Sequence, residues 1–461
     1  MAEMRFERRM SDQDALMWAI EKDPLLRSTI TTVSILEASP DRERFEDQLE
    51  RATRTVPRLR QRVVSAPLSG APPRYVIDEN FDLAYHVRWL KAPGDGSLRA
   101  LLDMAAPLAM QGFDRARPLW EFDVVEGLAE GRAALVSKIH HSITDGVGAM
   151  KLTMSFLDTK PDRARDTSPL PIPPDPERLS PLALWREALE HETRRQTGIA
   201  QRLGGEFVRA ARNPVGTARA TVEGARSTAH MLRPVTTPLS PIMGKRSLSV
   251  HFDTLTASLP RMKAAAKSVD GRLNDAFVAA VVGGLDRYHQ RHDAPVEALR
   301  MTMPINVRTA DQAMEAGNQF VPARFPVPLG IPDPRERMRR LTSLVASERA
   351  EPALGMVAPI AGVLNRLPVS VTTRLFGGML KGIDFVTSNV PGAPIPIYVA
   401  GARLEANFAF GPLSGSAMNI TLLSYIDELH LGVNTDRAAV PDPDVLLECL
   451  QDGIDEVEKL G

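Results

Sequence analysis

The sequence predicts a two-domain protein of the mixed α/β class with a helical linker between the domains. At 461 residues the chain exceeds the roughly 250–300 residues over which a single hydrophobic core grows. Strand-like and helix-like segments alternate over residues 1–158 and again over 246–461. Residues 159–245 are instead rich in proline and then in arginine and alanine, which is typical of a linker followed by crossover helices. We therefore expect an N-terminal lobe, a linker and a C-terminal lobe with these boundaries.

The elements of the N-terminal lobe follow from residue type and periodicity. A run of β-branched residues predicts a strand at 29–36, and further strands are expected at 85–90, 120–125 and 133–139. Helical spacing of apolar residues predicts helices, at 45–56, 98–110 and from 147 onward. Pro57 ends the first of these helices. The last strand leads directly into a pair of histidines, and the helix after them places this pair at a strand-to-helix junction.

The C-terminal lobe shows the same two patterns. Strands are expected at 248–252, 299–307, 396–410 and 418–433. Residues 273–288 are nearly all apolar and predict a buried helix. Further helices are expected at 334–349, 354–365 and 370–381, and a final one from Asp442. Residues 389–392 combine proline and glycine and are interpreted as a turn.

Composition excludes several functional classes. The chain has 56 basic and 57 acidic residues, a net charge of -1, so no overall field attracts nucleic acid, and none is expected as a partner. Its one cysteine, Cys449, lies among apolar residues and rules out intrachain disulfides and cysteine-rich zinc sites. The longest apolar run, 276–285, is shorter than the about 20 residues that span a bilayer, and residues 1–9 lack a signal-peptide core. We expect a cytoplasmic location.

The pair His140 and His141 is the first candidate for chemistry. An imidazole with a pKa near about 6.5 can take a proton at neutral pH and return it within one cycle. Neighbouring residues of an extended segment point to opposite faces, so only one of the two is expected to be catalytic. Asp145 can fix the turn or pair with a cation, and Gly146 permits close backbone packing. The alternative is that the pair merely ends a buried strand. A metal site is not expected, because adjacent histidines on a strand point to opposite faces and so cannot both bind one ion.

The segment HHSITDG at 140–146 resembles the HHxxxDG signature of the chloramphenicol acetyltransferase and condensation-domain superfamily. Four more segments are similar to the bacterial wax ester synthase/diacylglycerol acyltransferase family. They are LMW at 16–18, RPLWE at 117–121, LND at 273–275 and SNVPG at 388–392. They occur in that family's order, and the resemblance covers nearly the whole chain.

The resemblance implies two chloramphenicol-acetyltransferase-like α/β lobes that face each other across a cleft, with His141 at their interface. It implies an acyl-CoA-dependent O-acyltransferase in which His141 is the general base, within a motif that also holds His140, Asp145 and Gly146. No acyl-enzyme and no cofactor is required, since acyl-CoA is the substrate. Consistent with direct transfer, no Gly-x-Ser-x-Gly elbow occurs in the sequence. Asp145 would hold the loop, with Arg308 as a partner.

The tetrahedral intermediate of such a reaction places negative charge on the former carbonyl oxygen. A neutral donor placed there in advance is worth roughly 3–4 kcal/mol. Asn274 is the candidate for this donor. The alternative is that Asn274 caps the apolar helix it opens, as asparagine commonly does.

The resemblance also implies the partners. The acceptor is expected to be diacylglycerol or a long-chain alcohol, which gives triacylglycerols or wax esters. There are two alternatives. The enzyme could use another hydroxyl or amine acceptor, or the protein could be a non-catalytic, lipid-binding relative. Residues 354–385 are apolar with interspersed basic side chains, so they would suit peripheral contact with a lipid droplet or the inner face of a membrane, although buried helices explain them equally well. The sequence does not identify the residues that contact CoA. It does not determine the oligomeric state either.

Overall fold

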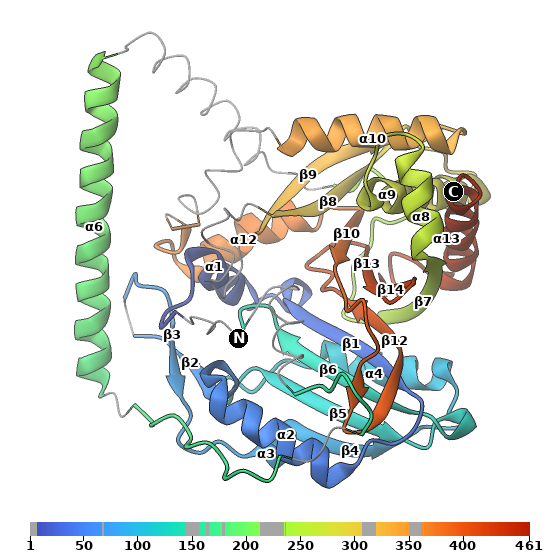
Figure 1. Ribbon diagram of the computed structural model, residues 1–461. Helices are drawn as coiled ribbons and strands as arrows, with labels where there is room; N and C mark the ends of the chain where they lie inside the picture. The colour runs from blue at the N-terminus through green and yellow to red at the C-terminus, as the bar shows by residue number, and fades with distance from the viewer. Residues whose placement is uncertain are drawn as a thin grey trace.

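The computed structural model describes residues 7–66, 69–143, 156–162, 166–177, 180–212, 235, 237–306, 320–349, 361–362 and 364–461. Within these ranges the chain forms two six-stranded sheets and a two-stranded sheet, with helices packed on the larger sheets (Figure 1). This arrangement confirms the predicted α/β class. The lobe boundaries at 158 and 245 stay predictions.

The first large sheet has the strand order β11-β12-β1-β6-β5-β4. Its strands are β1 (Thr29–Leu36), β4 (Val87–Lys91), β5 (Trp120–Glu126), β6 (Ala133–His140), β11 (Tyr398–Val399) and β12 (Ala402–Phe410). Every pairing is antiparallel except that of β4 with β5. Helix α2 (Arg42–Thr55) covers one face and α4 (Leu98–Met110) covers the other. Strand β6 therefore runs through the interior, and all of its residues are buried.

Short elements surround this sheet. They are α1 (Asp12–Ile20), α3 (Leu83–His86), the 3-10 turns Pro24–Leu26, Pro57–Arg60 and Ala129–Gly131, and the two-stranded sheet of β2 (Gln61–Val64) and β3 (Arg74–Ile77). Helix α1 begins after Ser11, whose side chain accepts a hydrogen bond from the amide of Asp14 and so caps the helix. The buried side chains of α1 pack its last turn against the end of the first sheet where β6 carries the two histidines.

The second large sheet has the order β7-β14-β13-β10-β8-β9. Its strands are β7 (Val250–Ser258), β8 (Ala298–Asn306), β9 (Phe320–Pro328), β10 (Phe385–Val390), β13 (Met418–Tyr425) and β14 (Glu428–Asp436). The associated helices are α8 (Leu259–Lys267), α9 (Leu273–Arg291), α10 (Pro334–Arg349), α12 (Val369–Leu380) and α13 (Pro443–Glu458). Helix α9 is buried between this sheet and its neighbouring helices, as its apolar sequence predicts.

Strands β11 and β12 come from the second half of the chain but complete the first sheet (Figure 1). Residues Thr31 to Leu36 of β1 pair antiparallel with β12. The ring of Phe410 on β12 stacks on that of Phe252 on β7, with the ring centroids 4.0 Å apart. The two sheets are therefore joined both by strand exchange and by aromatic packing.

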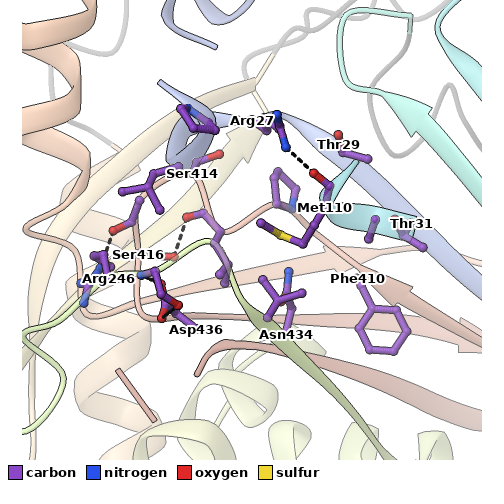
Figure 2. A pocket seen from close by; sticks show the side chains of 18 of the residues that line it. Arg27, Thr29, Thr31, Met110, Arg246, Phe410, Ser414, Ser416, Asn434 and Asp436 are labelled. Atoms are coloured by element: carbon purple, nitrogen blue, oxygen red, sulfur yellow. Dashed lines mark hydrogen bonds between the residues drawn. The ribbon is translucent and has the colours of Figure 1, made fainter. Parts of the chain in front are cut away.

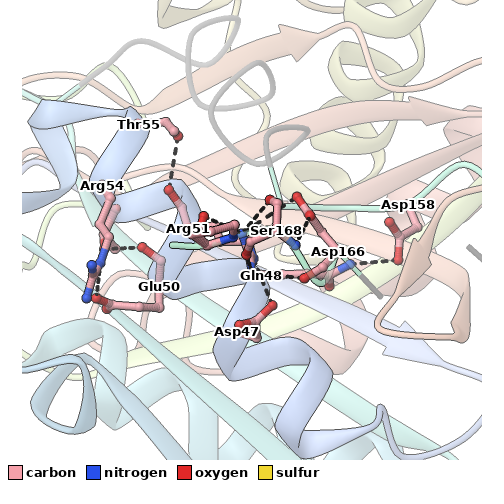
Figure 3. A network of polar contacts seen from close by, with 11 residues as sticks. Asp47, Gln48, Glu50, Arg51, Arg54, Thr55, Asp158, Asp166 and Ser168 are labelled. Atoms are coloured by element: carbon pink, nitrogen blue, oxygen red, sulfur yellow. Dashed lines mark hydrogen bonds and ion pairs between the residues drawn. The ribbon is translucent and has the colours of Figure 1, made fainter. Parts of the chain in front are cut away.

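The segment after the first sheet is bound along α2 (Figure 3). Gln48 donates to the buried carboxylate of Asp158 at 2.8 Å, and Arg51 donates to the carbonyls of Asp166 and Ser168 at 2.8 and 2.7 Å. This network fixes where the chain leaves the histidine region. The chain then continues as the 32-residue helix α6 (Pro181–Arg212), which stands to one side of the molecule in Figure 1.

Helix α6 contacts the rest of the protein through ion pairs. Arg195 pairs with Asp12 of α1 at 2.7 Å, Glu187 pairs with Arg74 of β3, and Glu192 pairs with Arg366. These three side chains lie on one face of the helix, since they are spaced by about one or two turns. In the described part of the chain no helix is long and apolar enough to cross a membrane.

The structure corrects two strand predictions in the second half. Residues 396–410 form two strands, because Ala400 and Gly401 take positive φ values of 43° and 96° and turn the chain. Residues 418–433 fall on two strands of a hairpin, with Ile426 at φ 53° in the turn. Ala400 and Ile426 are not usual residues for this conformation, which is why both turns were missed, although Gly401 is a residue that permits one.

Other strands were not predicted. Residues 389 and 390, interpreted as the start of a turn, are the end of β10. Strand β9 contains three prolines at Pro322, Pro326 and Pro328. Strand β9 is an edge strand that pairs only with β8 in the sheet order, which is the position where proline is tolerated. The helices expected from 147 and over 354–365 lie wholly or mostly outside the described residues.

Candidate active site

The two histidines end the interior strand β6. His140 faces Thr29 of β1 across the ladder, and the amide of His141 donates to the carbonyl of Ser28 at 2.8 Å. The pairing thus extends one residue past the strand and fixes the backbone of His141. Asp145 and Gly146 lie outside the described residues.

His140 is buried and both of its ring nitrogens are occupied. Its Nδ1 accepts the amide N–H of Ser142 at 3.0 Å and lies 2.7 Å from the Oγ of Ser142, while Nε2 lies 2.8 Å from Oε1 of Glu21. A backbone amide can only donate, so Nδ1 carries no proton and the Nε2–H donates to Glu21. The edges of Trp18 and Phe113 close the remaining sides, with ring centroids at 5.4 and 6.0 Å. His140 therefore has the structural role that was the alternative to catalysis.

Glu21 organises this end of the sheet. Its Oε1 also accepts the amide N–H of Ser28 at 2.6 Å, and Arg115 lies 3.8 Å from Oε2. Burial alone would raise the pKa of Glu21. The hydrogen bonds from His140 and from the amide of Ser28, together with the charge of Arg115, outweigh burial and hold that pKa below its ordinary value. Glu21 is therefore ionised at neutral pH and connects both strands that carry the histidine turn.

The turn at residues 141–143 is held from a second direction by β3. The hydroxyl of Tyr75 donates to the carbonyl of Ser142 at 2.5 Å, and the amide of Ile143 donates to the carbonyl of His140 at 3.0 Å. The guanidinium of Arg58 lies 3.3 Å from the centre of the Tyr75 ring. Burial raises the pKa of Tyr75 to about 12, so its hydroxyl stays protonated and remains a donor at neutral pH.

His141 is partly exposed, whereas His140 is buried. The side chain of His141 is thus the one of the two that solutes can approach, and its backbone is fixed by Ser28 and by the turn that follows. A side chain on a rigid backbone, with access from outside, has the properties that a general base needs.

Asn274 is the second residue of α9, the helix that packs against the second sheet. The helix start is capped by its neighbour, because the carboxylate of Asp275 accepts the amide N–H of Arg272 at 2.8 Å. The Nδ2 of Asn274 lies 3.3 Å from the Sδ of Met303 on β8, a weak contact. Helix capping, the alternative role for Asn274, is thus performed by Asp275. The two histidines lie together in the first sheet, while the described contacts of Asn274 hold it to the second.

Sequence reasoning missed Glu21 and Tyr75. Trp18 was noted as part of a family-like segment, and Glu21 follows it by three residues, which is one helical turn. No local signal connects Glu21 with His140, since 119 residues separate them in sequence. The same holds for Tyr75 and Ser142, because only the folded chain brings β3 to the histidine turn.

A pocket lies between the two large sheets, next to the histidine end of β1 (Figure 2). Its wall contains residues of β1, β7, β12 and β14, the end of α4 and the loop before β13. Thr29, which faces His140 across the ladder, is part of this wall. The pocket therefore begins beside the end of β1 that pairs with the histidine end of β6, while neither histidine is among its lining residues.

Comparison with known proteins identifies the family. A model described as "Wax ester synthase/diacylglycerol acyltransferase catalytic domain" matches residues 10–277, and one described as "WS/DGAT C-terminal domain" matches residues 316–458. The chain belongs to the wax ester synthase/diacylglycerol acyltransferase family. The first match includes both histidines and Asn274. This is an acyltransferase family, which confirms the class of enzyme that the sequence motifs indicated.

Relatives and solved structures agree with this membership. A Mycobacterium tuberculosis protein named as a diacylglycerol O-acyltransferase is 37% identical over 470 residues, covering 100% of this chain and 94% of the relative. A second one so named is 30% identical and covers 94% of this chain and 93% of the relative. The structure of the wax ester synthase/diacylglycerol acyltransferase from Marinobacter aquaeolei is similar, with a TM-score of 0.61, 23% identity and coverage of 98% and 99% of the two chains.

The first condensation domain of the calcium-dependent antibiotic synthetase has the same fold. Its TM-score is 0.62 at 13% identity, over 99% of this chain and 96% of that chain. At such low identity the likeness concerns the fold alone. It confirms the two-lobed architecture that the HHxxxDG resemblance implied.

Proposed function

We propose that this member of the family transfers a long-chain acyl group from acyl-CoA to the hydroxyl of diacylglycerol or a long-chain alcohol, with His141 as the general base. The observation that carries the proposal is the partly exposed His141, on a fixed turn, in a chain that matches the family over nearly its whole length. Its neighbour His140 is committed to Glu21 and Ser142 and has no nitrogen left for substrate.

The proposed reaction needs one proton transfer in each direction. His141 removes the proton of the acceptor hydroxyl while its oxygen attacks the thioester carbonyl carbon. The tetrahedral intermediate then collapses, the carbon–sulfur bond breaks, and the CoA thiolate takes the proton back from His141. The amide of Asn274 is the proposed donor to the oxyanion, and it is not used for capping. Asp145 and Gly146 are proposed to hold the loop after the histidines.

Peripheral contact with a lipid surface is part of the proposal. Helix α6 exposes Leu182 by 76%, Trp185 by 47% and Leu189 by 54%. Their spacing of three and four residues places them on one face of the helix. On α12, which belongs to the apolar stretch 354–385, Val371 and Leu375 are also exposed. We propose that the α6 face rests on a lipid droplet or on the inner face of a membrane, where the acceptor is dissolved.

The test is an acyl transfer assay with matched histidine variants. Purified wild-type protein is given palmitoyl-CoA with a diacylglycerol, a long-chain alcohol or a long-chain amine, and both CoA release and the product are measured. We expect ester from the wild type and a 10²- to 10⁴-fold lower kcat for His141→Ala, roughly the contribution of a general base. His191→Ala, on the surface of α6, is the control and should keep the wild-type rate.

Three outcomes would contradict the proposal. Ester formation by His141→Ala at the wild-type rate would show that another group removes the proton. Product from the amine alone would assign the enzyme to a different acceptor, and CoA binding without any product would assign it a binding role.

A further inference from the structure

The side chain of Arg74 on β3 is a buried cation that is held by two carboxylates from a later part of the chain. Arg74 is 2% exposed, and its Nη2 and Nη1 donate to Glu177 and Glu187 respectively. Glu177 lies just before α6 and Glu187 lies in its second turn, and both side chains are partly exposed, by 38% and 35%. The segment that leads into α6 and the helix itself therefore neutralise a charge inside the first half of the protein.

A second cation lies beside the first. Arg9 forms an isolated β-bridge with Arg74, and its Nη2 lies 3.8 Å from the carboxylate of Glu187. Burial lowers the pKa of Arg9, the charge of Glu187 opposes this shift, and the like charge of Arg74 adds to it. Two arginines thus face two carboxylates. Loss of either carboxylate would leave two like charges with a single counter-charge, at a place that is largely removed from water.

Strand β3 connects this group of charges to the histidine turn. The residue after Arg74 is Tyr75, whose hydroxyl donates to the carbonyl of Ser142. In its sheet β3 pairs with β2 alone, and a two-stranded sheet is marginally stable by itself. The position of β3 therefore depends on the contacts of its side chains. The ion pairs of Arg74 are strong ones among these, because hydrogen bonds between ionised groups are stronger than those between neutral groups.

Helix α6 is itself held at more than one point. About two turns after Glu187, Arg195 donates to both carboxylate oxygens of Asp12 on α1, at 3.1 and 2.7 Å. Figure 1 shows α6 along the side of the molecule where β3 and α1 lie. Ion pairs on separate turns fix the rotation of the helix about its axis, and so they fix the position of Glu187.

We propose that Glu177 and Glu187 are positioning residues for the proposed base: through Arg74 they hold β3 where Tyr75 keeps its hydrogen bond to the turn that carries His141. The inference deepens the proposed function and rests on it. The described contacts of the two carboxylates are with arginines and not with the histidines. They act on the turn only through the strand between them, which is why sequence position gives no hint of the role.

Hydrogen–deuterium exchange, resolved to single amides, tests the proposal without any need for turnover. The amides of His141 and Ile143 are hydrogen-bonded and exchange only when the turn opens. Glu187→Gln should accelerate their exchange about three- to tenfold, and Tyr75→Phe should do so by a similar factor, since it removes the hydrogen bond itself. Glu177→Gln is the second variant of the pair and should act as Glu187→Gln does. Amides of β13 report unfolding of the whole protein and should exchange at the wild-type rate.

A double-variant cycle identifies the route. If Glu187 acts through Tyr75, Glu187→Gln should have little further effect in a protein that already carries Tyr75→Phe. The same pattern is expected for kcat in the acyl transfer assay. Each single variant should lower kcat about three- to tenfold and leave KM unchanged, because the turn that carries the base is altered and the binding of substrate is not.

Glu192→Gln is the matched control. Glu192 lies on the same helix and also pairs with an arginine, but that arginine is Arg366 and not a residue of β3. This variant should keep the wild-type exchange rates and kcat. Equal effects of Glu192→Gln and Glu187→Gln would overturn the inference. So would fully independent effects of Glu187→Gln and Tyr75→Phe, or exchange of the turn at the wild-type rate in Glu187→Gln.

The positioning role and the proposed reaction can fail separately. If the wild type forms no ester but the exchange rates change as expected, the reaction is lost and the coupling of α6 to the turn stands. If the wild type forms ester and Glu187→Gln has the same kcat, the reaction stands and the positioning role is wrong.

Discussion

At the scale of single residues, the histidine turn depends on a carboxylate that lies far away in sequence. Glu21 receives hydrogen bonds from His140 and from the amide of Ser28, and Ser28 in turn accepts the amide of His141. One side chain thereby fixes the tautomer of the structural histidine and the backbone of the proposed base. We regard Glu21 as a positioning residue, because its described contacts are with His140, Ser28 and Arg115.

We predict that Glu21→Gln lowers the free energy of unfolding by about 1.5–3 kcal/mol at neutral pH, since a charged acceptor of buried hydrogen bonds is lost. The pKa of Glu21 is lowered in the folded protein, so its contribution is complete above the unfolded pKa and is lost as pH falls through the folded one. The difference between wild type and variant should therefore shrink below the ordinary pKa of glutamate. Urea unfolding at a series of pH values measures it.

Glu428→Gln is the matched control for this prediction. Glu428 also lies beside a histidine, His430, at 3.1 Å, but its side chain is 59% exposed. Solvent screens such a pair, so the substitution should change stability by less than about 1 kcal/mol. Equal effects of the two substitutions would refute the role assigned to burial at Glu21.

At the scale of elements, the contact between helices α9 and α13 depends on two glycines. A Cβ on Gly453 would lie 2.2 Å from the carbonyl oxygen of Ala280, and one on Gly284 would lie 2.7 Å from the Cα of Leu450. The helices therefore approach with their backbones in contact, which only glycine permits. This contact keeps α9 on the second sheet and so positions Asn274 at its first turn.

We predict that Gly453→Ala lowers the free energy of unfolding by about 1–3 kcal/mol, because the helices must separate to admit the methyl group. Gly378→Ala on α12 should act in the opposite direction. A Cβ there meets nothing within 4 Å, and alanine favours a helix over glycine by about 0.5–1 kcal/mol. Thermal unfolding of both variants compares them, and a neutral Gly453→Ala would contradict the close contact.

At the scale of the whole molecule, the chain joins its halves twice. Strand β12 enters the first sheet from the second half, and helix α6 pairs with α1, with β3 and with Arg366. Beside these ion pairs, α6 leaves Leu182, Trp185 and Leu189 exposed along one face. An amphipathic helix in this position is suited to hold the enzyme against a lipid surface.

We predict that replacing Leu182, Trp185 and Leu189 together with glutamine lowers the affinity for phospholipid vesicles at least tenfold, a change of about 1.4 kcal/mol that is well within the burial energy of three apolar side chains. Vesicle flotation measures the bound fraction. Glutamine at Leu248 and Ile395, two other exposed apolar positions, provides the control and should leave binding unchanged. Undiminished flotation of the triple variant would exclude this face of α6.

Much of the site was predictable because its signals are local. The mostly apolar segment before the histidines predicted β6, and because adjacent residues of a strand face opposite sides, the two rings were predicted to have different roles. Which ring is structural was not predictable, since it depends on Glu21 and Ser142. Likewise the sequence indicated Asn274 as the possible helix cap, and only the hydrogen bond from the amide of Arg272 assigned capping to Asp275.

The sequence by itself determined the α/β class, the buried helix α9, the histidine turn at the end of an interior strand and the family. These features follow from residue type, short-range periodicity and short motifs, which are properties of the chain before it folds. The tertiary structure alone decided the exchange of β11 and β12, the partner of Glu21 and the pocket between the sheets. Each of these joins segments distant in sequence, and such pairings are selected by the packing of the whole core, which no local pattern encodes.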